Sequence, residues 1–124
     1  MTTPYNLIGG ENGVRKLARE FYDVMSSRSE AKTIREMHAP DLSLIEDKLY
    51  MFLSGWMGGP DLYFEKYGTV CLTNPHANYA IGNNERDQWL DCMDQALEKI
   101  GASDELKAML KQPMFNIADL VKNR

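Results

Sequence analysis

The apolar residues of this chain recur at helical spacing, and no alternating run is long enough to predict a strand. One stripe, repeating at i, i+3, i+4, i+7, i+8 and i+11, predicts a helix from about Asn12 to Ser26. Three more amphipathic helices are expected downstream. They are a helix opened by a Ser43/Glu46 capping box and ended by Gly58-Gly59-Pro60, a helix from Gly82 or Asn83 to Gly101, and a helix capped by Ser103 and kinked at Pro113. The pattern indicates an all-α fold.

The connections between these helices are unequal in length and character. Ser29 to Met37 and Asp61 to Tyr67 are predicted to form one or two helical turns each, and Gly68 to Pro75 an irregular run. An up-and-down bundle would have short loops and helices of matched length. We therefore expect helices that cross one another.

Length and charge limit the kinds of partner. A chain of 124 residues is the size of one ordinary domain, spanning residues 1–124. The net charge of −4 and the absence of a basic cluster argue against nucleic acid. No stretch approaches the length of a membrane span and no leader pattern is present, so no membrane partner is expected and the predicted location is the cytoplasm. Cys71 and Cys92 fit no metal-binding spacing and are expected to remain thiols.

His76 is one of only two histidines and stands in a short irregular stretch before the helix that carries Trp89. An imidazole on a loop or a single turn can direct its Nε2 at a buried metal. A histidine near a helix start is also commonly a packing or capping residue. The residues alone leave both roles open.

Several motifs, taken in order, resemble the truncated haemoglobins of group II. They are Gly9-Gly10, Met51-Phe52-Leu53 followed by Gly58-Gly59-Pro60, Pro75-His76-Ala77, and Glu85-Arg86-Asp87-x-Trp89-Leu90-x-Cys92-Met93. The resemblance extends from about Tyr5 to Val121. It implies a truncated globin, in which a two-over-two helical sandwich encloses haem b (iron protoporphyrin IX), with His76 as the proximal iron ligand.

The same resemblance places Tyr22, in the Phe21-Tyr22 pair, and Trp89 on the distal side. An indole N–H donates and a phenol can donate, so this pair favours a ligand that gains negative charge, such as dioxygen. The alternative is that both are simply large core residues. His38 falls on an aromatic family position, where it could donate a third hydrogen bond, relay a proton or bind the iron, or it could cap a turn beside Pro40.

The resemblance also implies a set of haem-pocket residues. Ile45 and Leu49 would form an apolar wall that strengthens the few polar contacts. Lys48, Tyr63 and Tyr67 are candidates for holding the propionates, whereas Pro75 replaces an arginine that the family often has before its proximal histidine. The remaining predicted pocket residues are Phe52, Leu72, Tyr79, Ile81 and Met93.

Three functional classes follow from these residues. The first is a haem protein that binds dioxygen or another diatomic ligand at a five- or six-coordinate iron. The second is a haem-dependent redox enzyme, similar to a nitric oxide dioxygenase or a peroxidase. It would need an external reductase, because the chain has no flavin or nicotinamide motif. The third is a haem-free helical interaction domain, which would leave the combination of Tyr22, His76 and Trp89 without a reason.

Overall fold

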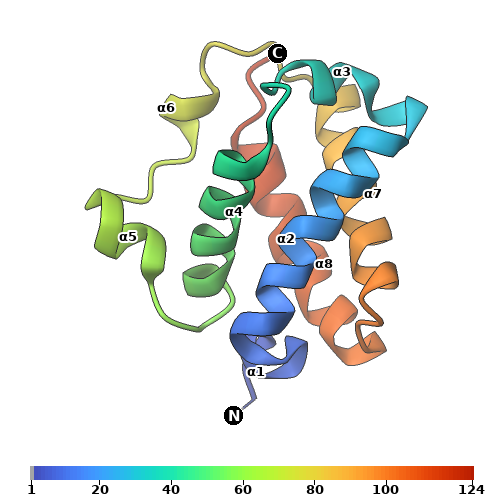
Figure 1. The fold of residues 1–124 in the computed structure, drawn as a ribbon. Coiled ribbons are helices and arrows are strands. Elements are labelled where there is room, and N and C mark those ends of the chain that lie inside the picture. The colour runs from blue at the N-terminus through green and yellow to red at the C-terminus, as the bar shows by residue number, and fades with distance from the viewer. Residues whose placement is uncertain (1) are drawn as a thin grey trace.

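The computed structural model describes residues 2–124, apart from the side chain of Asn74, and these residues are helical with no strand (Figure 1). The predicted all-α class is therefore confirmed. Among the same residues, no helix has both the length and the apolar character that crossing a membrane requires. The elements are α1 (Pro4–Ile8), α2 (Gly10–Ser27), the 3-10 turn η1 (Ser29–Ala31), α3 (Lys32–Glu36), α4 (Ser43–Trp56), α5 (Leu62–Tyr67), α6 (Thr73–His76), α7 (Asn83–Lys99) and α8 (Asp104–Leu120).

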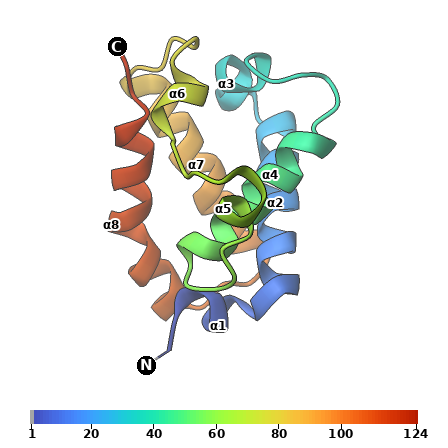
Figure 2. The ribbon, with the colours of Figure 1, turned by 90° about the vertical axis from the view of Figure 1, so that its left-hand side faces the viewer.

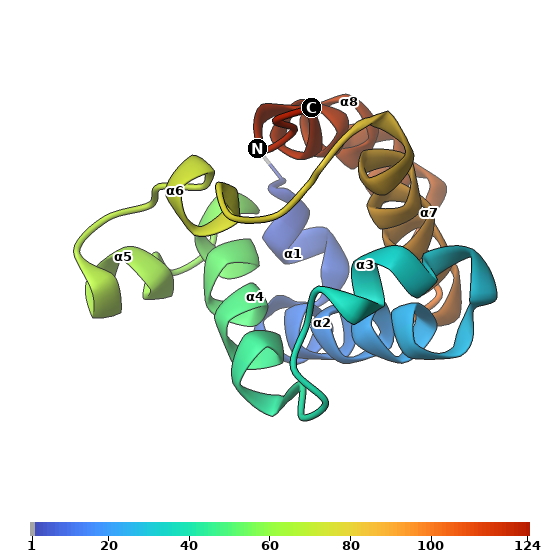
Figure 3. The same ribbon diagram turned by 90° about the horizontal axis from the view of Figure 1, so that it is seen from above.

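Four long helices, α2, α4, α7 and α8, form the body of the molecule. Helix α2 packs against both α4 and α7, and α7 packs against α8. Seen from above, α2 crosses α4 rather than running beside it (Figure 3). The short helices α5 and α6 lie outside α4, at the edge of the molecule (Figures 1 and 2). This arrangement matches the expected crossed packing and differs from an up-and-down bundle.

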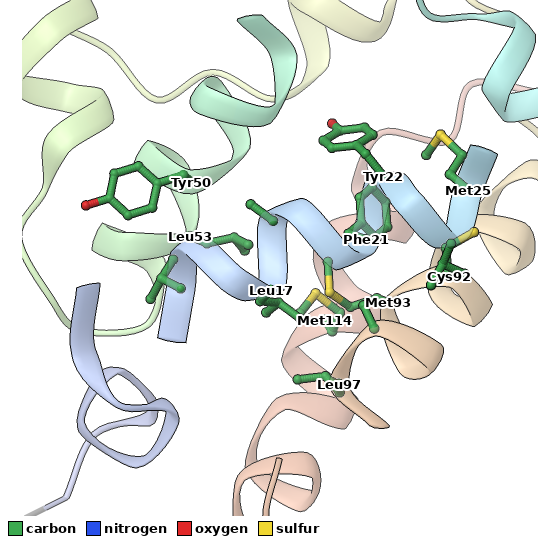
Figure 4. Close-up of a cluster of buried hydrophobic side chains, with 14 of the residues drawn as sticks. Leu17, Phe21, Tyr22, Met25, Tyr50, Leu53, Cys92, Met93, Leu97 and Met114 are labelled. Atoms are coloured by element: carbon green, nitrogen blue, oxygen red, sulfur yellow. The ribbon is translucent and has the colours of Figure 1, made fainter. Parts of the chain in front are cut away.

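Helix α2 is central because its apolar stripe is buried along its whole length. All six stripe residues are buried, namely Val14, Leu17, Ala18, Phe21, Tyr22 and Met25. They meet Leu53 of α4 on one side and Met93 of α7 on the other in a single core (Figure 4). The stripe predicted from the sequence is confirmed, and it explains why one helix contacts two neighbours.

A sharp turn at Gly9 and Gly10 separates α1 from α2. Both residues have positive φ angles, 101° and 70°. Residues that carry a side chain rarely adopt this backbone conformation, whereas glycine adopts it readily. The turn lets α1 fold back to contact both α2 and α8.

The predicted N-terminal caps are right for two helices and wrong for one. The N–H of Leu106 donates to Ser103 Oγ at 3.1 Å, so Ser103 caps α8, and Glu85 accepts from the Gly82 N–H at 2.7 Å at the start of α7. Ser43 is instead the first residue of α4, and its N–H donates to Asp41 Oδ1 at 2.9 Å. The Ser43/Glu46 capping box is therefore wrong, because an aspartate two residues upstream forms the turn.

The segments between the helices were largely predicted. Helical turns are found within Ser29–Met37 and Asp61–Tyr67, as expected. The run predicted to be irregular up to Pro75 contains the turn α6, which ends at His76. Helix α8 continues through Pro113.

Cys92 provides a test of the core at alkaline pH. Its side chain is fully buried on α7, and burial, reinforced by Asp91, raises the pKa of the thiol from 9.0 to about 11. The folded state therefore favours the neutral thiol. The contribution of this preference to the free energy of unfolding is complete below pH 9 and is lost as the pH rises from 9 to about 11. We expect the free energy of unfolding, measured in urea, to fall more steeply over this range for the wild type than for Cys92→Val. Parallel curves would contradict the assignment.

Candidate functional site

A cavity of about 450 Å³ is lined by side chains of α2, α4, α7 and α8 and by the segment that carries α6. The structure brings together here most of the residues singled out from the sequence. Those lining the cavity are Tyr22, His38, Ile45, Lys48, Leu49, Phe52, Tyr63, Leu72, His76, Tyr79, Ile81 and Trp89. A concave, mainly apolar cavity with a few polar groups is the usual form of a cofactor site.

His76 lies at the end of α6 and faces this cavity. Its Nδ1 is hydrogen-bonded to the carbonyl oxygen of Leu72. A carbonyl oxygen can only accept, so Nδ1 carries the proton and Nε2 of the neutral ring keeps its lone pair. Metal-binding histidines are typically held in this way, with the second nitrogen donating to a backbone carbonyl.

The donor set around His76 fits a metal that brings its own ligands. No group of three or more His, Cys, Asp or Glu residues that could hold a metal ion occurs among the residues the structure describes. A porphyrin supplies four nitrogen ligands, so one imidazole in an apolar cavity suits its iron. The residues present therefore fit haem.

Tyr22 presents its phenol to the same cavity. Its ring packs edge-on against Phe21 with centroids 4.9 Å apart, and its hydroxyl points away from the core (Figure 4). Burial, with the nearby Glu46 carboxylate adding in the same direction, raises the pKa of the phenol far above its usual range. The hydroxyl therefore keeps its proton and can donate a hydrogen bond.

Trp89 of α7 also lines the cavity and packs against Phe21. Its ring lies 5.3 Å from that of Phe21. Phe21 thus packs against both predicted distal residues and fixes their separation.

His38 follows α3, and its ring lies 5.6 Å from that of Tyr22. Its Nδ1 lies 2.8 Å from the carbonyl oxygen of Ile34, so Nδ1 carries the proton here too. Burial lowers the pKa of His38, against the opposing effect of the Ile34 hydrogen bond. A lowered pKa favours the neutral ring, in which Nε2 carries the lone pair. Nδ1 is thus engaged with the Ile34 carbonyl, and Nε2 is the ring nitrogen left for the distal roles expected of His38.

The proposed propionate-binding residues lie together on α4 and α5. Lys48 and Tyr63 line the cavity, and Lys48 Nζ lies 5.8 Å from the centre of the Tyr67 ring. The Tyr67 ring is tilted against the Tyr63 ring, with centroids 4.6 Å apart, and is exposed. It supports the cavity wall from outside instead of lining it.

Met93 was assigned to the pocket but is packed in the core. It is almost completely buried and faces α2 beside Leu17 (Figure 4). Trp89 and Met93 lie one turn apart on the same face of α7. This face packs against α2 at both positions, but it lines the cavity only at Trp89. A shared motif on one helix therefore does not place all its residues in one site.

Several cavity residues were not predicted. They are Ile34, Met37, Cys71, Pro75, Glu85, Arg86, Ile117, Ala118 and Val121. Ile117 and Val121 belong to the apolar stripe of the last predicted helix, and this stripe could have indicated a second wall of the cavity. Arg86 stood within a quoted motif, and it bonds Asp87 and Asp119 at 3.0 and 2.9 Å, so two carboxylates share its charge.

Comparison with known proteins agrees with this geometry. The bacterial-like globin family model matches residues 3–123. The chain belongs to the bacterial-like globins. Haem binding is a property of this family, as is the binding of diatomic ligands such as oxygen. The chain is 34% identical over 107 residues to the group 2 truncated hemoglobin YjbI of Bacillus subtilis, covering 86% of this chain and 78% of the relative.

Solved structures give the same result for the fold. A cold-adapted truncated hemoglobin from Pseudoalteromonas haloplanktis is similar with a TM-score of 0.94 and 37% identity, covering 99% of each chain. A group II 2-on-2 hemoglobin from Agrobacterium tumefaciens has a TM-score of 0.93 and 37% identity, covering 99% of this globin and 95% of that chain. The resemblance to group II and the two-over-two fold are thus confirmed.

The two histidines test this geometry directly, because each should carry its proton on Nδ1. We expect long-range ¹H–¹⁵N spectra of the diamagnetic ferrous carbonyl form at neutral pH to show the Nδ1–H tautomer for both His38 and His76. A proton on Nε2 of either ring would contradict the hydrogen bond assigned to it.

Proposed function

We propose that this globin, as one domain over residues 1–124, binds haem b through Nε2 of His76 and holds dioxygen or another diatomic ligand with Tyr22 and Trp89 as donors. The observation that carries the proposal is the bond from His76 Nδ1–H to the Leu72 carbonyl, in a cavity that Tyr22 and Trp89 also line. That bond leaves Nε2 available and fixes the plane of the imidazole.

The ferrous haem supplies reversible binding of the diatomic ligand, and the chain supplies its environment. A dioxygen ligand gains negative charge, so it is stabilised by groups that donate. Tyr22 stays protonated because it is buried, and an indole N–H can only donate. The apolar side chains of Ile45 and Leu49 keep the effective dielectric low, which strengthens both hydrogen bonds.

A haem-dependent redox activity, either nitric oxide dioxygenation or peroxidase-like chemistry, is the second candidate, and His38 favours it. Its neutral ring lines the cavity with Nε2 unprotonated, so it could accept a proton from a peroxide-type ligand. Electrons for repeated turnover would come from a separate reductase in the cytoplasm, where we place this globin. Peroxide-dependent turnover that His38→Ala abolishes would favour this candidate.

Removal of the proposed iron ligand tests the site. We expect His76→Gly to lose the iron–imidazole coordination seen in the absorption spectrum of the reduced protein. Added imidazole should restore that spectrum by occupying the space left by the side chain. If His76→Gly keeps the wild-type spectrum without imidazole, another residue binds the iron and the proposal fails.

Replacement of Trp89 tests the donor role. One hydrogen bond to the ligand worth about 1.4 kcal/mol corresponds to a tenfold change, so Trp89→Phe should release oxygen on the order of ten times faster in stopped-flow experiments. Trp56→Phe is the matched control. Trp56 borders a different, smaller cavity and reaches the haem cavity only through the stacked ring of Phe52, so its loss should leave the release rate unchanged. Equal rates for the wild type and Trp89→Phe would remove Trp89 from the mechanism.

A further inference from the structure

The segment that follows α8 lies beside the connection between α6 and α7, as the terminal trace shows at the top of Figures 1 and 2. Asn123 joins the two. Its side-chain Nδ2 donates to the carbonyl oxygens of His76 at 3.3 Å and Tyr79 at 2.8 Å, and its Oδ1 accepts from the Ile81 N–H at 3.0 Å. The backbone N–H of Asn123 also donates to the Ile81 carbonyl at 2.8 Å.

The connection that Asn123 binds has little structure of its own. Residues 77–80 are exposed and lie outside any helix. Within this loop the Tyr79 N–H donates to the His76 carbonyl at 3.1 Å, which makes that carbonyl an acceptor for two groups. Backbone groups in such a loop need partners to hold one conformation. Asn123 supplies these partners to the backbone of His76, Tyr79 and Ile81.

The chemistry of these bonds requires an amide at position 123. The side chain uses two N–H donors and one oxygen acceptor at once. Because the carbonyl partners can only accept and the Ile81 N–H can only donate, they fix the positions of Nδ2 and Oδ1. An aspartate has the same shape but cannot donate to the carbonyls of His76 and Tyr79.

The residues on either side of Asn123 bond to the first residue of α7 and to Ile81 just before it. Lys122 Nζ donates to Asn83 Oδ1 at 3.0 Å, and the Arg124 N–H donates to the Ile81 carbonyl at 3.1 Å. The segment is therefore held in one register against the loop. A change of side chain at position 123 alone should remove the loop contacts without releasing the segment.

We infer that Asn123 is a positioning residue for His76, fixing the peptide from which the imidazole reaches the iron and so the geometry of the iron–imidazole bond. This inference rests on the proposed function, in which His76 is the iron ligand. Asn123 acts through the backbone of His76 and Tyr79 and does not line the cavity.

The test compares Asn123→Asp with the wild type. The variant keeps the acceptor for the Ile81 N–H and loses both donors. We expect the iron–imidazole stretching band, recorded by resonance Raman just after photolysis of the ferrous carbonyl form, to shift and broaden. Transfer of haem to excess apomyoglobin should be roughly tenfold faster, because two hydrogen bonds that order the loop are gone.

Two further variants separate positioning from other effects. Asn123→Ala removes the side-chain bonds without adding charge, so it must move the band in the same direction as Asn123→Asp. Lys122→Ala is the matched control, since its side chain contacts Asn83 and Asp119 but not the loop, and it should keep the wild-type band.

The outcomes distinguish the inference from the proposed function. An iron–imidazole band that is missing from the wild type overturns the role of His76, and the inference with it. A wild-type band that stays unshifted in Asn123→Asp and Asn123→Ala overturns the positioning role alone. Reduced stability in urea with an unshifted band would assign Asn123 to folding only, which also overturns the inference.

Discussion

The hydrogen bond between His76 Nδ1 and the carbonyl oxygen of Leu72 is the interaction on which the site depends. It is made within one turn of helix, four residues apart, and it decides which nitrogen keeps a lone pair. If that proton moved to Nε2, the imidazole could no longer bind a metal from the cavity side. The short helix α6, the loop after it and the contacts of Asn123 all help to keep this one ring in one orientation.

Helix α2 links the stability of the globin to the environment of its ligand. Phe21 is fully buried in the core, yet its ring contacts both Tyr22 and Trp89, which face the cavity. Closely packed interiors transmit small displacements. The Tyr22 phenol and the Trp89 indole are therefore positioned by the same packing that holds α2 against α7. The polar groups at the cavity also differ in kind, since the Tyr22 hydroxyl keeps its proton and His38 Nδ1 is bonded to the Ile34 carbonyl.

Membership of the bacterial-like globins establishes haem binding and the two-over-two fold. It does not assign a tautomer to His38 or a partner to Asn123. Those follow from which atoms of this chain lie within hydrogen-bonding distance, and they are the points at which this globin can be compared experimentally with its relatives.

The sequence by itself determined the four long helices, the buried stripe of α2 and the Ser103 cap, because these depend on spacing and on residues within one turn of each other. Motif order placed His76, Tyr22 and Trp89 in one region, and they do line one cavity. Only the tertiary structure decided that Met93 faces the core, that Asp41 rather than Ser43 turns the chain into α4, and that His38 Nδ1 bonds the Ile34 carbonyl. The bond from Asn123 to His76 spans 47 positions, and no local pattern encodes a contact that forms only when α8 has packed against α7.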